Sequence, residues 1–204
     1  MRAGLKRSLG WVEAGLYLGG LGLLAAFALA LLEGERQREA GIDAFHAAPD
    51  LSLWDAQRIR AYESSLAVEA APPLAVLNIG RLGIEVPVYD GADDFNLNRG
   101  VARIAGTAAV DAAGNLGIAG HRDGFFRALK DVEIGDRIEL FTGQGARNYS
   151  VSSIDIVDPQ DVGVLAPTEA TTVTLVTCYP FYYVGHAPKR YIVKAIAEHS
   201  LDVH

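Results

Sequence analysis

The chain has 204 residues, of which 50% are hydrophobic and 21% are charged, and its formal net charge is -7. This length and composition fit one compact domain with an appendage and exclude a disordered or collagen-like chain. The 25 Asp and Glu residues outnumber the 18 Lys and Arg residues, which argues against a nucleic-acid-binding groove as the main function. Cys178 is the single cysteine, so neither an intramolecular disulfide nor a cysteine-based zinc site can form.

The first informative segment is the uncharged apolar run 14–32. A helix over this range is about 28 Å long, which just spans the hydrocarbon core of a bilayer. We expect a transmembrane helix here; a cleaved secretory signal and a buried core helix are the alternatives. Arg2, Lys6 and Arg7 precede it and the charges after it nearly cancel, so residues 1–13 are predicted to be cytoplasmic and the rest of the chain to face outward.

Residues 33–73 are predicted to form a juxtamembrane stalk and linker. Within them, the segment 52–68 begins with a capping-box-like pair, Ser52 and Asp55. It carries apolar side chains near helical spacing. This pattern predicts one amphipathic helix that packs against the main domain. Its apolar positions are Leu53, Ile59, Tyr62 and Leu66.

Pro72-Pro73 stops helical propagation, so we expect a folded domain over residues 74–198, followed by a C-terminal tail at 199–204. In this domain, short β-branched runs are divided by Gly, Asp and Pro, which is typical of a barrel or sandwich. Short helical pieces are expected near 93–97 and 125–130. Eight strands are predicted, at 75–79, 84–89, 101–104, 116–119, 137–141, 149–157, 173–178 and 191–197.

The segment Thr-Leu-Val-Thr-Cys at 174–178 is a strand pattern that runs directly into Cys178, and Tyr179-Pro180 ends it. The thiol is therefore expected at a strand end, where loops can build a site around it. A buried, inert cysteine is the alternative. A thiolate nucleophile needs a proton acceptor or a positive charge nearby, because the pKa of a free thiol is about 8.5.

The proton acceptor must come from the histidines. His46 lies in the stalk, and His199 and His204 lie at the C-terminal end. His121 ends a predicted strand and opens into a turn, whereas His186 lies in the loop that follows the thiol. This spacing favours His121 and leaves His186 as the alternative.

Arg190 is the candidate for a third role, because acyl transfer passes through an oxyanion. A donor fixed against that charge can contribute about 2.7–4 kcal/mol. Arg190 opens the last predicted strand, just after the loop that follows Cys178, and its guanidinium keeps its charge. A surface ion pair on a strand is the alternative.

Together these motifs resemble the sortases, the membrane-anchored cysteine transpeptidases of bacterial cell surfaces. Sortases carry a TLxTC strand with an upstream histidine and a downstream arginine, and all three features occur here in that order. The sequences around these motifs are most similar to those of class D sortases. One departure is minor, because LNIGRLG lacks the proline that often follows the isoleucine. The matching stretches are residues 76–91, 114–140 and 174–193.

The resemblance implies the eight-stranded sortase β-barrel over 74–198, with His121, Cys178 and Arg190 at the catalytic positions. It also implies cleavage of an LPxTG- or LPxTA-like sorting motif after its threonine, through a thioacyl intermediate. The implied partners are secreted proteins with a C-terminal sorting motif and an amine acceptor such as a cell-wall peptide, or water. The implied location is a bacterial cell membrane, with a single span and the catalytic domain outside.

Two other functions compete with this interpretation. L,D-transpeptidases also use a cysteine in a β-rich domain outside the membrane, but TLVTC with a distant arginine argues against them. A catalytically silent, membrane-tethered binding module with the same fold is the second alternative.

Calcium binds between barrel loops in some sortases, but we expect no cofactor and assign no metal, because acidic loops are ordinary in a chain of this charge. By analogy, the segment 158–172 before the cysteine strand is where the substrate is expected to be read. The acidic loop side chains are Asp93, Asp94, Asp158, Asp161 and Glu169.

Overall fold

The structure is a computed structural model, and it describes residues 49–182 and 185–198. Within these ranges, no helix has both the length and the apolar character needed to cross a bilayer. The predicted transmembrane helix at 14–32 and the tail at 199–204 lie outside the described residues.

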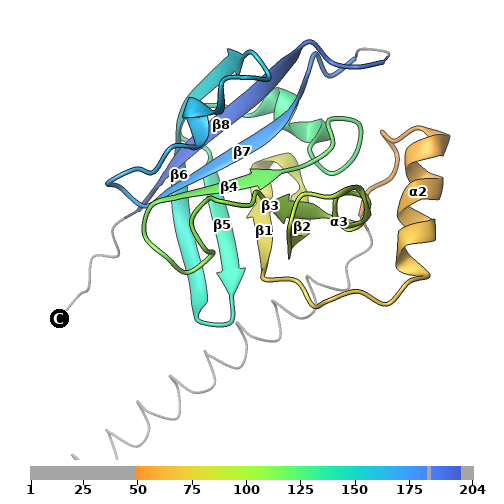
Figure 1. The fold of residues 1–204 in the computed structure, drawn as a ribbon, viewed down its shortest axis with the longest axis horizontal. Helices are drawn as coiled ribbons and strands as arrows, with labels where there is room; N and C mark the ends of the chain where they lie inside the picture. Colours follow the sequence, from red (N-terminus) through yellow and green to blue (C-terminus); the bar gives the residue numbers. More distant parts are fainter. Residues whose placement is uncertain (1–48, 183–184, 199–204) are drawn as a thin grey trace, which may run out of the picture. The chain divides into compact units, whose positions relative to one another are not determined.

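Eight strands close into a barrel, as predicted (Figure 1). The barrel order is β1-β2-β3-β4-β7-β8-β6-β5. Each strand lies where the alternation of apolar and polar residues predicted it, with ends that differ by at most four residues. The strands are β1 (Ala75–Ile79), β2 (Ile84–Asp90), β3 (Val101–Arg103), β4 (Asn115–Ala119), β5 (Arg137–Thr142), β6 (Gly145–Val157), β7 (Thr172–Tyr179) and β8 (Lys189–Ala197).

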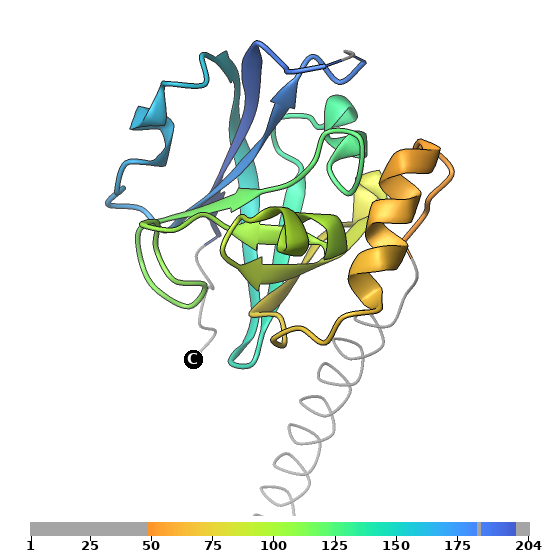
Figure 2. The same cartoon turned by 45° about the vertical axis from the view of Figure 1, so that its right-hand side comes forward.

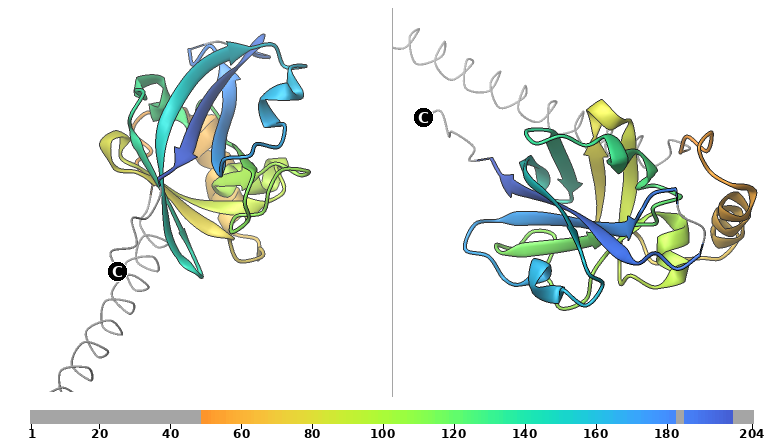
Figure 3. Two further views of the ribbon diagram at one scale, coloured as in Figure 1. Left: turned by 90° about the vertical axis from the view of Figure 1, so that its left-hand side faces the viewer. Right: turned by 90° about the horizontal axis from the view of Figure 1, so that it is seen from above.

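Two of the eight pairings are parallel, β2 with β3 and β4 with β7. The other six pairings are antiparallel. A parallel pairing needs a long crossover, so β4 reaches β7 only after the chain has passed through β5 and β6. This crossover brings the carboxyl ends of β4 and β7 to the same end of the barrel (Figure 3).

The core fills the interior of this barrel with side chains that alternate inward along the strands. Burial of this apolar surface is the main force that holds the closed sheet together. Among the core side chains that are fully buried are Leu77, Ile79, Val88, Ile118, Ile138, Leu140, Leu175 and Val193.

One α-helix, α2 (Ala56–Leu66), packs on the outside of the barrel beside α3 (Asp94–Arg99) (Figure 2). The predicted amphipathic helix is therefore present, but it is shorter than 52–68 because Asp55 caps it. The Asp55 side chain accepts hydrogen bonds from the backbone N–H groups of Gln57 and Arg58, which satisfies donors that have no partner inside the helix.

The apolar face predicted for this helix is only partly the face that contacts the rest of the domain. Ile59 and Tyr62 are half-buried, whereas Leu66 is 51% exposed, and Leu53, which lies before α2, is 57% exposed. Arg99 of α3 fastens the end of the helix, because its guanidinium donates to the carbonyl oxygens of Ser65 and Val68 over 2.6 and 2.8 Å. Polar contacts thus hold α2 alongside the apolar ones.

The short helical pieces predicted near 93–97 and 125–130 correspond to α3 and to the 3-10 turn η2 (Arg127–Asp131). Two further 3-10 turns were not predicted, η1 (Gly80–Leu82) and η3 (Val162–Leu165). The turn η3 lies in the connection between β6 and β7.

Candidate active site

Cys178 and Arg190 lie directly opposite each other on neighbouring strands. The antiparallel register of β7 and β8 pairs their Cα atoms. Directly opposed residues point to the same face of a sheet, with Cβ atoms about 4.5–5.5 Å apart. The thiol and the guanidinium therefore project from one face at one end of the barrel, and both side chains are partly buried.

His121 reaches the same end of the barrel from the other side of β7. The parallel register pairs Ala119 of β4 with Val176 of β7, and the Gly120 N–H donates to the Val176 carbonyl over 3.1 Å. Continuing this register by two residues brings His121 level with Cys178. The three predicted site residues thus come from three adjacent strands, in the order β4, β7, β8.

The two threonines of the Thr-Leu-Val-Thr-Cys segment fasten β7 to β4. The Thr177 hydroxyl donates to the Gly120 carbonyl over 2.7 Å. At the other end of the strand, the Thr174 hydroxyl donates to Asn115 Oδ1 over 2.6 Å. Both bonds are buried, so the strand that carries the thiol and the strand that leads to His121 are held in one register.

A close contact explains why residue 120 is a glycine. A Cβ atom at this position would lie 2.5 Å from Cδ2 of Phe126, and the Phe126 ring is fully buried in the core. Phe126 also donates its backbone N–H to the carbonyl oxygen of His121 over 3.2 Å. The turn after His121 therefore folds back onto Gly120, and this packing sets the path of the backbone at His121.

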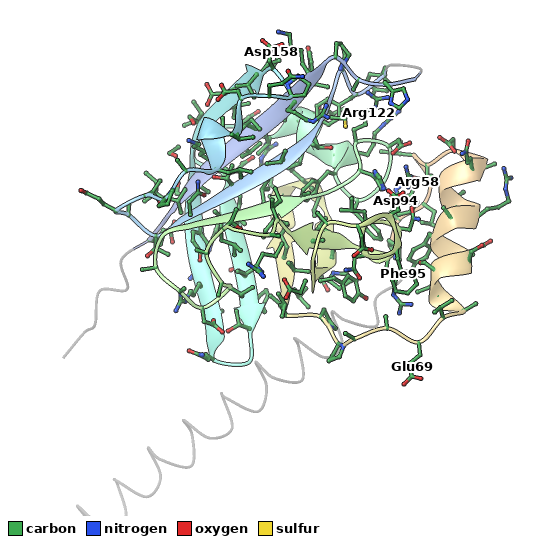
Figure 4. The ribbon with its side chains drawn as sticks, viewed as in Figure 1. Arg58, Glu69, Asp94, Phe95, Arg122 and Asp158 are labelled. Atoms are coloured by element: carbon green, nitrogen blue, oxygen red, sulfur yellow. The ribbon has the colours of Figure 1, made fainter. Side chains whose placement is uncertain are left out.

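Burial is the main cause that lowers the pKa of His121, because it disfavours the imidazolium form. The positive charge of Arg58 lowers this pKa further, whereas the carboxylates of Asp123 and Asp94 raise it. Arg58 comes from α2 and Asp94 from α3, and both are labelled in Figure 4 between α2 and the barrel. Charges from three segments thus act on one imidazole.

The loop between β7 and β8 is tied to the turn after His121. Arg122, labelled in Figure 4, donates to the Gly185 carbonyl over 2.9 Å, and Arg127 donates to the Phe181 carbonyl over 3.1 Å. His186, the alternative proton acceptor, is exposed in this loop. Arg190 donates to the carbonyl oxygens of Lys189 and Ala187 over 3.0 and 3.4 Å, so its guanidinium is oriented by its own strand and loop.

Asn115 joins the start of β4 to the segment between β6 and β7. Its amide donates to the carbonyl oxygens of Val164 and Ala166 over 3.1 and 3.0 Å, and it accepts from Thr174. The turn η3 is thereby held against the start of β4. Val162 on the same turn is 72% exposed, so the segment 158–172 presents an apolar side chain to solvent.

The acidic loop residues do not converge. In the part of the chain that the structure describes, no three His, Cys, Asp or Glu side chains form a group that could hold a metal ion. Asp93 caps α3 by accepting from the Asn96 N–H, and Asp158 pairs with Lys189 at 2.8 Å.

Several residues that shape the site were missed in the sequence. The hydroxyls of Thr174 and Thr177 belong to the motif, but strand alternation alone predicts no bond partner for them. Arg58 and Asp123 are far apart in the chain and pair at 3.1 Å. Only the position of Asp123, two residues after the candidate histidine, could have drawn attention to this pair.

Comparison with known proteins identifies the family of the chain. Residues 77–198 match the model of the sortase domain family. The chain is 34% identical to Sortase D of Bacillus subtilis strain 168 over 132 residues, which are 64% of this chain and 67% of that protein. It is 37% identical to Sortase A of Staphylococcus aureus over 103 residues, 47% of this chain and half of that protein.

A solved structure shows the same fold. The Sortase D5 transpeptidase of Clostridium perfringens aligns with a TM-score of 0.58 and 24% identity, over 79% of this chain and 95% of that one. The family match covers more than half of the chain, and it includes β7, β8 and the turn at His121. The chain belongs to the sortase family of cysteine transpeptidases.

Proposed function

We propose that this chain is a membrane-anchored sortase that attaches secreted proteins to an amine acceptor at the bacterial cell surface. The observation that carries the proposal is the juxtaposition of Cys178, Arg190 and the His121 turn on three adjacent strands. In this proposal, residues 14–32 are the membrane span and the barrel lies outside the cell.

The substrate is a C-terminal sorting motif of the LPxTG or LPxTA kind. The Cys178 thiolate attacks the carbonyl carbon of the motif's threonine, and a C–S bond forms as the carbonyl oxygen takes the negative charge. Arg190 donates to this oxyanion or to the substrate backbone. The C–N bond to the next residue then breaks, and protonated His121 gives its proton to the departing amine.

The thioester is resolved by an amine. Neutral His121 takes a proton from the attacking amine, a new C–N bond forms, and the Cys178 thiolate leaves. Water in place of the amine gives hydrolysis. No metal ion takes part in the proposed steps.

Membrane anchoring would raise the rate of this reaction. An enzyme and a substrate held in one bilayer meet at a high effective concentration. Turnover need not be fast under these conditions, which suits a site where burial lowers the pKa of His121 and disfavours its protonated form.

The test is to incubate the purified full-length chain with LPxTG- and LPxTA-type peptides and to search for a thioacyl adduct by intact-protein mass spectrometry. We expect an adduct that maps to Cys178. It should be absent in Cys178→Ala, and its formation or turnover should fail in His121→Ala and Arg190→Ala. His186→Ala is the matched control, because it removes the exposed histidine of the β7–β8 loop and should behave as wild type.

A parallel alkylation of Cys178 separates the outcomes. A thiol that alkylates readily but forms no adduct with any peptide would contradict the proposed motif and leave the chemistry in place. A thiol that neither alkylates nor acylates would contradict the enzyme and favour a silent binding module.

A further inference from the structure

We propose that Arg58 of α2 is a positioning residue for the transpeptidation, because through Asp123 it holds the turn that carries His121. The helix α2 lies before residue 77, where the family match begins. Arg58 therefore lies outside the range that the family model matches. This inference rests on the proposed function, in which His121 moves the proton.

The Arg58 guanidinium bridges two segments of the barrel domain. Its Nη2 lies 3.1 Å from Asp123 Oδ1 and donates to Oδ2 at 3.4 Å, while its Nη1 donates to Asn98 Oδ1 at 2.7 Å. The Arg58 side chain is only 17% exposed and that of Asp123 is 35% exposed. A partly buried ion pair with a second hydrogen bond is worth more than a solvated surface pair.

Aromatic side chains hold the same turn from the same helix. Phe125 lies in the turn, and its ring packs edge-on against Trp54 and Tyr62, with centroid separations of 4.8 and 5.9 Å. Trp54 and Tyr62 also pack against each other at 5.8 Å. The turn at 121–126 is thus held from α2 and the residues just before it by one ion pair and two aromatic contacts.

The clamp transmits to His121 through the backbone. Gly124 and Phe126 both donate their N–H groups to the His121 carbonyl over 3.2 Å. A Cβ atom on Gly124 would lie 3.4 Å from Cδ of Arg58 and 3.6 Å from Cβ of His121. A shift of Asp123 or Gly124 therefore moves the imidazole, and displacements near 1 Å can cost about a hundredfold in rate.

The pair also sets the charge around His121, and its two members act in opposite directions. The Arg58 charge lowers the pKa of His121, and the Asp123 carboxylate raises it. Asp94 on α3 also raises it. The remaining site groups beside the imidazole are Cys178 on β7 and Arg190 on β8. Because the two charges act in opposite directions, removing each one should move the pKa of His121 in its own direction.

The test compares full-length Arg58→Met, Asp123→Asn and Arg58→Lys with wild type. The titration of His121 is followed by NMR of ¹³C-labelled histidine, and the His121 signal is identified by its loss in the His121→Asn variant. The constants kcat and KM are measured with a peptide that the wild type cleaves. Arg103→Met is the matched control. Its ion pair with Asp90 has a similarly covered arginine, 21% exposed, but it lies outside the charges that act on His121.

We expect the midpoint of the His121 titration to rise in Arg58→Met and to fall in Asp123→Asn, with kcat lowered about tenfold in both. Arg58→Lys should keep the midpoint of the His121 titration near that of wild type, because the positive charge remains. Its kcat should still be lower than that of wild type, because an ammonium group cannot bridge Asp123 and Asn98 in the same fork geometry. Arg103→Met should change neither quantity.

The proposal is overturned if the midpoint of the His121 titration in Arg58→Met and Asp123→Asn equals the midpoint in Arg103→Met. It is also overturned if both variants shift this midpoint in the same direction. The NMR measurement needs no substrate. If wild type fails to cleave any peptide, the proposed function fails on its own, and the titration still decides whether Arg58 and Asp123 govern His121.

Discussion

Thr177 donates its hydroxyl to the carbonyl oxygen of Gly120 over 2.7 Å, inside the buried seam between β7 and β4. Together with the bond from the Gly120 N–H to the Val176 carbonyl, it joins the residue before Cys178 to the residue before His121. The separation of the thiol and the imidazole is therefore fixed by a side chain of the same motif that carries the thiol.

Replacing Thr177 by Val keeps the shape of the side chain and removes this hydrogen bond. We expect a loss of about 1–3 kcal/mol in the free energy of unfolding, because a buried polar group loses its partner. We also expect a lower kcat with little change in KM, because the proposed acid and nucleophile lose their fixed spacing. Denaturant unfolding and peptide cleavage kinetics measure the two effects.

Thr174→Val is the matched variant on the same strand. It removes the buried bond to Asn115, so the loss of stability should be similar. Asn115 holds η3 through the carbonyls of Val164 and Ala166, and we propose that this segment reads the substrate, so the effect should fall mainly on KM. Equal effects of both variants on kcat would contradict the role given to Thr177.

Gly120→Ala tests the contact between Gly120 and Phe126. The added methyl group would lie 2.5 Å from the Phe126 ring, so either the ring or the backbone before His121 must shift. Overpacking of this kind costs about 1–3 kcal/mol, and we expect kcat to fall with the stability. Gly143→Ala is the control, because a Cβ atom there has no neighbour within 4 Å and should leave both quantities unchanged.

The eight strands could be predicted because each segment alternates inward and outward against one core, and Gly, Asp and Pro mark their ends. The positions of Cys178 and Arg190 at strand ends follow from the same pattern. The order of the strands could not be predicted, because the parallel pairing of β4 with β7 depends on a crossover through β5 and β6, and local sequence carries no record of it.

The α2 helix shows a second limit. Of the four apolar positions that helical spacing predicted, Ile59 and Tyr62 are half-buried, whereas Leu53 and Leu66 are exposed. Polar contacts with distant residues also orient the helix, such as Arg58 with Asp123 and Arg99 with the Ser65 carbonyl. Such pairings depend on the tertiary fold, so the pattern within the helix did not reveal them.

The ion pair between Arg81 and Asp136 should control stability in acid. Arg81 Nε and Nη2 donate to the two oxygens of Asp136 over 2.5 and 2.6 Å, and these bonds are the main cause that lowers the pKa of Asp136. A carboxyl with a lowered folded pKa adds stability above its unfolded pKa of about 3.9, and this stability is lost as the pH falls through the folded value.

Arg81→Met should therefore lower the free energy of unfolding at pH 7 and flatten its dependence on pH below about 4. Urea unfolding at a series of pH values measures both. Arg137→Met is the control, because its ion pair with Glu139 is longer, at 3.3 Å, and the arginine is 57% exposed. Identical pH profiles for the two variants would contradict the assignment.

His121 should titrate below the ordinary histidine value of about 6.5, because burial first and the Arg58 charge second lower its pKa. The folded state then favours the neutral imidazole. The stability contributed by this group is complete above about pH 6.5 and is lost as the pH falls through the lower folded pKa. His121→Asn should remove this part of the acid destabilisation, and unfolding at pH 7.5 and 5.0 measures it.

The same pKa leaves a minority of protonated His121 at neutral pH, so the proposed acid form is scarce and peptide cleavage should be slow. A His121 NMR midpoint at or above 6.5 would contradict both statements, and it would mean that the carboxylates of Asp123 and Asp94 outweigh the effect of burial.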